Sequence, residues 1–129
     1  MTAYLDLHDL VEIARRVLSA QPKVRDYGLL ASAAARPATT ISGIEAYGDP
    51  WTKAAALLHS LCRNHALLDG NERLAWAAAR VFLGLNGVPL VEVEVDRAEV
   101  LVLSVADGTL TEVTDIAADL RQLYRATLS

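Results

Sequence analysis

Two Ala- and Leu-rich segments, residues 50–64 and 72–87, carry apolar side chains at helical spacing and are separated by only a short polar stretch. Aromatic residues make up only 5% of the chain, so Leu, Val and Ala must fill the core. Small side chains of this kind favour closely spaced helices over a sheet sandwich. The sequence therefore predicts two consecutive helices, joined by a short loop, as a main part of the fold.

Caps and breakers predict where the other elements begin and end. Asp6 is a plausible N-cap for a helix over residues 7–18, and Asp49 with Pro50 opens the helix that runs to about Asn64. A short helix is expected over 27–35, ended by Pro37. Residues 38–48 are predicted to form an irregular or weakly extended loop.

The C-terminal third offers weaker signals. Residues 88–96 alternate like a short strand that has no obvious partner. Asp96 can cap a helix through Ala106, and Thr109 to Glu112 fits a capping box that opens a last helix to about Ala126. The sum is an all-α fold of five or six helices in one domain over residues 1–129.

Charge and cysteine content exclude several classes of protein. The formal net charge of −4 argues against nucleic-acid binding through a broad basic face. Cys62 is the only cysteine, so no internal disulfide can form, and a reducing cytoplasm is the expected location. The acidic, amphipathic N-terminus does not resemble a signal peptide, and no apolar run is long enough for a membrane span.

The polar stretch HALLDGNER, residues 65–73, joins the two apolar helices. A helix N-terminus offers unpaired N–H groups and a partial positive charge, which together attract anions. Gly70 would admit a phosphate closely, Arg73 could fork onto its oxygens, and Asn71 could cap the helix or bind a ligand oxygen. Asp69 is suited to Mg²⁺, and His65 to taking a proton from an attacking hydroxyl. The alternative is an ordinary turn with a helix cap.

The same nonapeptide resembles the signature of the Fic/Doc family, His-x-Phe-x-Asp/Glu-Gly/Ala-Asn-Gly/Lys-Arg, and the flanking segments fall in the family's order from about Tyr4 to Leu123. The resemblance implies a compact helical bundle with a minor extended flap, and binding of ATP with Mg²⁺. Fic-type members transfer AMP to a target hydroxyl. Doc-type members transfer the γ-phosphate of ATP to a threonine of elongation factor Tu, and the short chain resembles these more closely.

The resemblance carries roles onto individual residues. It implies that His65 is the catalytic base, that Asp69 is the Mg²⁺ ligand, and that the phosphate-binding positions are Gly70, Asn71, Glu72 and Arg73. Leu67 replaces the usual Phe, a mild change. Glu72 replaces Gly or Lys, and a carboxylate facing bound phosphates would cost roughly 2–8 kcal/mol of phosphate binding. The resemblance thus predicts a phosphotransferase that Glu72 attenuates, with an AMP transferase or a catalytically dead form as alternatives.

Doc-type members are held inactive by a Phd-type antitoxin, whose C-terminal helix lies in a groove of the toxin. An Ala- and Leu-rich bundle can present such an apolar groove. The partners implied are therefore this antitoxin and elongation factor Tu or another protein target, with no direct contact to nucleic acid or membrane.

Five further features have competing interpretations. Residues 38–43, with Arg36 before them, are either a flap that extends across the site or a surface loop with a locally paired arginine. A zinc site of His59, His65 and Asp69 matches no usual ligand spacing. Cys62 is expected to be a small buried hydrophobe. His8 is expected at the surface, and Trp76 is a packing residue that could wall the pocket.

Overall fold

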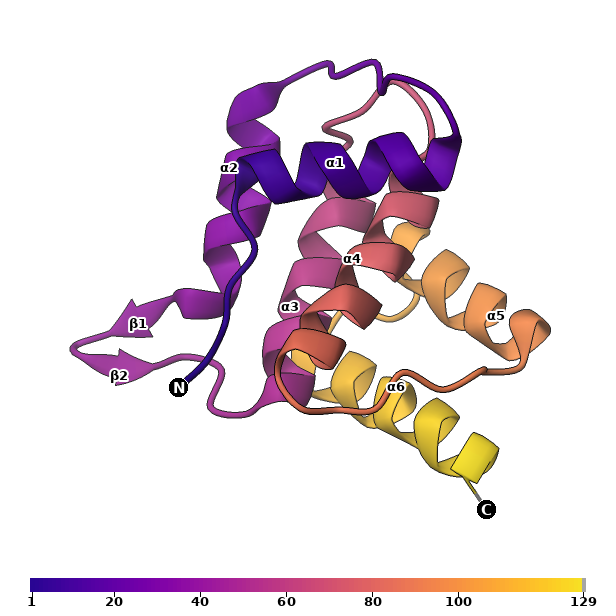
Figure 1. The fold of residues 1–129 in the computed structure, drawn as a ribbon. Coiled ribbons are helices and arrows are strands. Elements are labelled where there is room, and N and C mark those ends of the chain that lie inside the picture. Colours follow the sequence, from indigo (N-terminus) through magenta and orange to yellow (C-terminus); the bar gives the residue numbers. More distant parts are fainter. Residues whose placement is uncertain (129) are drawn as a thin grey trace.

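In the computed structural model, which describes residues 1–128, helices α3 and α4 lie side by side at the centre (Figure 1). The elements are α1 (Leu7–Leu18), α2 (Tyr27–Ala35), η1 (Arg36–Ala38), β1 (Thr40–Ile41), β2 (Ile44–Glu45), α3 (Pro50–Arg63), α4 (Asn71–Leu85), α5 (Val95–Ala106) and α6 (Val113–Leu128). The all-helical prediction is confirmed, and both apolar segments form the helices expected of them.

Small side chains let α3 pack closely on several neighbours. Ala54, Ala55 and Ala56 are fully buried on α3, as are Ala75, Ala78 and Ala79 on α4. Helix α3 contacts α2, α4, α5 and α6, while α1 crosses α4 (Figure 1). Larger apolar side chains complete the core, with these fully buried: Leu10, Leu30, Leu57, Leu58, Leu61, Leu67, Leu74, Phe82, Leu83, Val105, Ile116 and Leu120.

Three aspartates cap the helices that begin after them. Asp6 accepts from the Asp9 amide at 2.8 Å and completes a capping box with the Asp9 side chain. Asp49 accepts from the Thr52 amide at 3.0 Å, and Asp26 accepts from the Leu29 amide at 3.1 Å. The predicted caps at Asp6 and Asp49 are confirmed, because these signals depend only on neighbouring residues.

The strand predicted over residues 88–96 is wrong. This segment is irregular up to the start of α5, and the Arg80 guanidinium donates to the Val91 carbonyl in place of a partner strand. The predicted cap at Asp96 is also wrong, since α5 begins at Val95 with Glu94 in the N-cap position. Alternation alone cannot make a strand where no second strand is available to pair with it.

The capping box predicted at Thr109 is wrong as well. Helix α6 begins at Val113, and the Thr109 amide donates to Asp107 Oδ1 at 2.8 Å. The amides of Asp115 and Ile116 donate to the Glu112 carbonyl, each at 3.0 Å. The turn that ends α5 thus uses residues that the sequence pattern assigned to the next helix.

Residues 38–43 do not extend across the polar loop. They enter a small hairpin in which Ile41 pairs with Ile44. Lys53, which is only 2% exposed, bonds Glu45 Oε1 at 3.0 Å and the Tyr47 carbonyl, which holds the hairpin beside the N-terminal end of α3. The polar loop follows the other end of α3 (Figure 1).

Arg36 pairs locally, as the second interpretation of this region expected. Its guanidinium bonds Tyr47 Oη at 3.1 Å, the Ala56 carbonyl at 3.2 Å and Ser60 Oγ at 3.0 Å. Within the described residues, no helix is long and apolar enough to cross a membrane.

The corrected caps predict different losses of stability for two similar substitutions. Asp49→Ala removes an observed cap and should lower the free energy of unfolding by about 1 kcal/mol. Asp96→Ala removes an aspartate that caps nothing and should cost clearly less, through the helix dipole alone. Urea unfolding followed by circular dichroism measures both, and equal losses would contradict the assignment.

Candidate functional site

The loop between α3 and α4 begins with a left-handed residue. Asn64 is the C-cap of α3, and His65 follows with φ of 51°, which leaves its imidazole exposed. Arg25 compensates for this unfavourable conformation. Its Nε donates to the His65 carbonyl at 2.7 Å, and its Nη2 donates to the Asn64 carbonyl at 3.1 Å. The predicted catalytic base therefore stands on a fixed backbone at the surface.

The connection between α1 and α2 pairs with the next part of the loop. The Leu68 amide donates to the Lys23 carbonyl at 2.9 Å, and the Arg25 amide donates to the Ala66 carbonyl at 2.8 Å. Ala66 and Leu67 are buried beneath this pairing, with exposed fractions of 0% and 2%. Leu67 thus acts as the apolar anchor expected where the family has Phe.

Asn71 fixes the loop from the other side. Its Oδ1 accepts from the Leu67 amide and its Nδ2 donates to the Leu67 carbonyl, each at 3.0 Å. The side chain thereby bonds both backbone polar groups of Leu67. Asn71 does not cap the helix but braces the loop, and its contact with a ligand stays a prediction.

The first turn of α4 is open to an anion. Its N-cap is Gly70, with φ of 87°, and no side chain caps the helix. Within residues 1–128, the amides of the first turn therefore lack the partner that Asp6, Asp26 and Asp49 supply to other helices.

Gly70 is required at this point for two reasons. A Cβ at this position would lie 2.6 Å from Leu18 Cδ2, and the positive φ disfavours any other residue. The last turn of α1 thus closes one side of the loop, which the sequence did not indicate.

Asp69 lies beside these amides with an exposed carboxylate. Its Oδ1 accepts from the Gly70 amide at 2.9 Å, and no hydrogen bond occupies Oδ2 among the described residues. One free carboxylate oxygen next to an uncapped helix N-terminus suits Mg²⁺, which takes few protein ligands and completes its shell with phosphate oxygens and water.

The three residues of the considered zinc site do not gather. His59 lies on α3, and its Nδ1 is 2.7 Å from Arg36 Nη1. Burial and the nearby Arg36 charge lower the pKa of His59. The described residues contain no group of three potential ligands that would include His65 and Asp69. Cys62 is buried, and burial raises the pKa of its thiol to about 12, consistent with a small hydrophobe.

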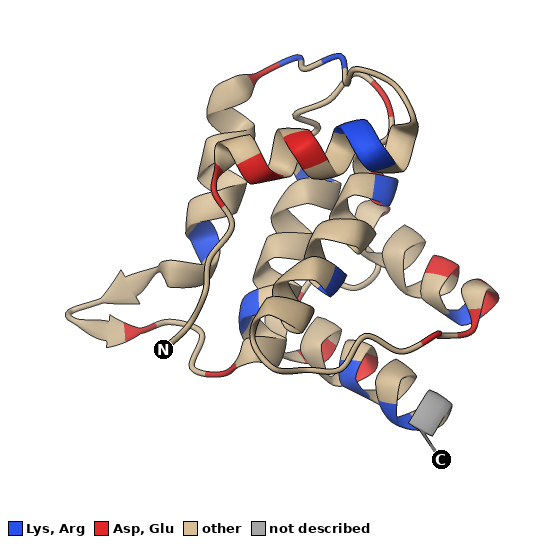
Figure 2. Cartoon of the chain, viewed as in Figure 1, with Lys and Arg blue, Asp and Glu red and all other residues tan. Residues whose placement is uncertain are grey.

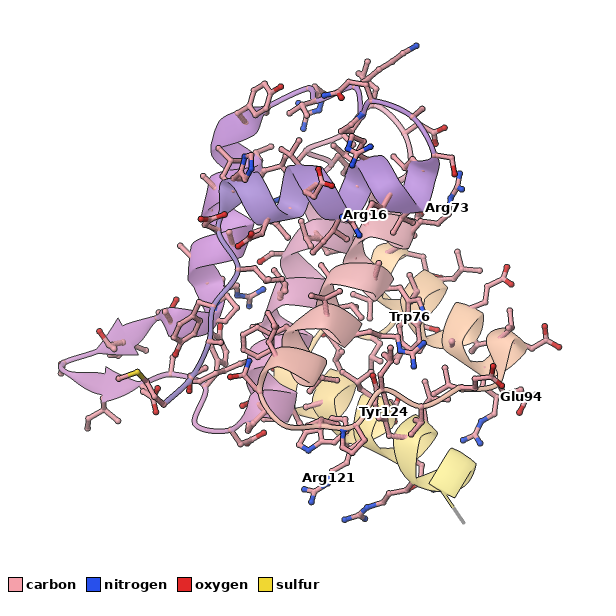
Figure 3. The ribbon with its side chains drawn as sticks, in the orientation of Figure 1. Arg16, Arg73, Trp76, Glu94, Arg121 and Tyr124 are labelled. Atoms are coloured by element: carbon pink, nitrogen blue, oxygen red, sulfur yellow. The ribbon has the colours of Figure 1, made fainter. Side chains whose placement is uncertain are left out.

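Glu72 and Arg73 are exposed on the first turn of α4 and line a groove between α4 and α5, which we call the α4–α5 groove. Its volume is about 590 Å³. Trp76 forms part of its wall, as considered from the sequence, and Figure 3 shows Trp76 one turn along α4 from Arg73. The Arg80 guanidinium lies over the Trp76 ring at 5.6 Å from its centroid.

Basic side chains gather near the polar loop although the net charge of the chain is −4. Figure 2 shows Lys and Arg where the end of α1, the connection to α2 and the start of α4 meet. Part of this charge is already paired, because Glu12 bonds both Arg15 and Arg16, and these bonds lower the pKa of Glu12 to about 2. Asp26, Asp69 and Glu72 lie at the same end, so this cluster contains acidic as well as basic residues.

Substitution by alanine should change the stability of the protein in opposite directions at Gly70, the N-cap of α4, and at Gly84, within α4. Gly70→Ala places a Cβ at a left-handed φ and obliges the Leu18 side chain to move, so it should lower the free energy of unfolding by about 1–2 kcal/mol, mainly through backbone strain. Gly84→Ala on α4 meets open space and should raise it by about 0.5–1 kcal/mol through helix propensity. Thermal and urea unfolding measure both, and a neutral Gly70→Ala would contradict the left-handed backbone at this position.

Sequence comparisons agree with this geometry. Residues 4–83 match the Fic/DOC family. The chain is also 52% identical over 121 residues to a protein named Toxin Doc from Mycolicibacterium smegmatis (strain ATCC 700084 / mc(2)155), an alignment that covers 93% of this chain and 92% of that protein. With the motif, the helical fold and both matches in agreement, the chain belongs to the Fic/DOC family.

Proposed function

We propose that this chain is a Doc-like toxin of a toxin–antitoxin system, which transfers the γ-phosphate of ATP to a threonine hydroxyl of a translation factor such as elongation factor Tu. The main support is the open first turn of α4, which is preceded by Gly70 and lies beside Asp69. The extensive identity to a protein named Toxin Doc supports the same conclusion.

The proposed reaction divides the work among residues of one loop. The amides of the first turn of α4 and Arg73 hold the phosphates. His65 takes the proton of the target hydroxyl as its oxygen bonds to the γ-phosphorus, and the bond from that phosphorus to the β,γ-bridging oxygen breaks to release ADP. Mg²⁺, held by Asp69 and phosphate oxygens, would neutralise charge that develops on the phosphates.

Other residues in and around the loop hold its backbone in the conformation that the reaction needs. Arg25, Leu67 and Asn71 fix the backbone on which His65 and Asp69 stand. An imidazole on a fixed backbone loses little freedom when the target binds, which favours the reaction.

Glu72 affects this proposal less than its sequence position suggested. The estimated repulsion assumed a carboxylate close to the phosphates. The observed side chain is exposed and borders the α4–α5 groove, where water and salt screen its charge. Attenuation by Glu72 therefore stays a prediction, and phosphate transfer stays the proposed activity of the chain as it stands.

The proposed partner that controls the toxin is a Phd-type antitoxin. Val100 of α5 is apolar and 65% exposed, and it lies outside the α4–α5 groove. A helix with apolar side chains on several faces suits contact with a second amphipathic helix. This surface supports an antitoxin helix as partner.

Phosphate transfer can be measured with ATP labelled at the γ-phosphate, Mg²⁺ and elongation factor Tu. Labelled phosphothreonine is expected. His65→Asn should reduce the rate by about 10²–10⁴-fold, because it removes the base while keeping a residue that tolerates a left-handed φ. His8→Asn, at an exposed histidine of α1, is the matched control and should change nothing.

The position of the label separates the alternatives. Transfer of an α-phosphate label would establish AMP transfer instead. The absence of phosphothreonine with this chain and also with Glu72→Lys would contradict the proposed kinase activity.

A further inference from the structure

The α4–α5 groove begins at the proposed phosphate site. Glu72 and Arg73, which border the groove, are also in the first turn of α4, whose amides are open to an anion. Residues 72, 76 and 80 are spaced four apart and therefore lie on one face of the helix. Figure 3 shows Arg73 and Trp76 on the same side of α4. A ligand anchored by phosphate at the loop can thus extend along α4 into the groove.

The dimensions suit the rest of a nucleotide. A rise of 1.5 Å per residue places Trp76 about 6 Å along the helix from Glu72. In a nucleotide, the ribose lies between the phosphates and the base. Phosphates at the first turn would therefore bring the ribose beside Glu72 and the base near Trp76. The volume of about 590 Å³ is within the range of small-molecule sites.

The walls of the groove offer the chemistry that a nucleoside requires. Trp76 supplies an aromatic surface for a base, and Val102 and Leu103 supply apolar surface from α5. Glu72 and Glu99 contribute carboxylates, which accept hydrogen bonds, and ribose hydroxyls donate them. Neither carboxylate forms an ion pair among the described residues.

Arg80 also lines this groove and keeps its positive charge, since both of its hydrogen bonds go to neutral acceptors. Its Nε donates to Tyr124 Oη at 3.2 Å, and its Nη2 donates to the Val91 carbonyl. The same guanidinium lies over the rings of Trp76 and Tyr124. Arg80 therefore fixes Trp76 in place, which prepares the wall for a flat ligand.

We propose that the α4–α5 groove binds the nucleoside part of the phosphate donor, with ribose hydroxyls donating to the Glu72 carboxylate and the base against Trp76. This inference rests on the proposed function, because it takes the donor to be a nucleotide whose phosphates lie at the first turn of α4. It makes Glu72 a residue that selects ribonucleotides, and it gives the acid at this position a positive role.

Calorimetry with Mg²⁺ tests the role of Glu72 through three ligands: ATP, 2′,3′-dideoxy-ATP and inorganic tripolyphosphate. ATP should bind more tightly than tripolyphosphate. Glu72→Ala should weaken ATP binding by about tenfold, the effect of losing hydrogen bonds to a charged group, and should not weaken tripolyphosphate binding. Dideoxy-ATP should bind equally to both proteins. Glu92→Ala, which removes the same charge from an exposed site outside the groove, should leave ATP binding unchanged.

Fluorescence tests the role of Trp76 independently. Trp51→Phe leaves Trp76 as the only tryptophan, and Phe keeps a ring beside Tyr124. ATP and adenosine should alter the emission of Trp76, whereas tripolyphosphate should not.

The outcomes separate the two proposals. If Glu72→Ala tightens ATP and tripolyphosphate alike, Glu72 acts on the phosphates, so the groove assignment is overturned while nucleotide binding stands. The groove assignment also fails if Trp76 is insensitive to ATP that calorimetry shows to be bound. Adenosine binding without tripolyphosphate binding would support the groove and contradict the phosphate site. If no ligand binds, both proposals fail.

Discussion

The pairing between residues 23–26 and the polar loop is the interaction on which the candidate site depends. Helices α3 and α4 could be joined by many seven-residue loops, and most would be mobile. Here the backbone of Lys23 and Arg25 bonds Leu68 and Ala66, while the Arg25 guanidinium holds the turn after α3. Leu67 is buried beneath the pairing. One strained histidine and one exposed aspartate are thereby kept in a single arrangement at the surface.

Local signals made much of this fold predictable. Helix starts with an Asp cap or with Pro at the first position depend on neighbouring residues, and such signals located α1 and α3 correctly. The strand at 88–96 failed because a side chain from another helix intervenes, and the cap at Thr109 failed because a neighbouring turn uses the same residue. Arg80, from α4, takes the Val91 carbonyl, and Asp107, from the end of α5, takes the Thr109 amide.

The candidate site likewise contains residues that a local motif identifies and residues that only the fold brings in. His65, Asp69, Gly70, Asn71 and Arg73 are adjacent in sequence, so a single motif identified them. Arg25 and Leu18 support the loop from far earlier in the chain, and nothing in their local sequence marks that role. The α4–α5 groove was not foreseen either, because its walls come from two helices whose packing is set by the whole core. Only the spacing of Glu72, Trp76 and Arg80 at intervals of four could have suggested a shared face.

Helix geometry explains how an acid can be tolerated at the start of α4. The amides that attract an anion point along the helix axis, beyond the first turn, whereas side chains leave the axis sideways and lean towards the N-terminus. Asn71 leans back onto the loop, and Glu72, one residue further around the helix, borders the groove. The charge of the side chain at position 72 therefore acts on a ligand in the α4–α5 groove as well as on a phosphate at the end of the helix. In the sequence, position 72 is simply the eighth residue of the polar stretch, and nothing there separates these two directions. In the folded chain they are distinct, since Glu72 borders the groove while the open amides face the loop.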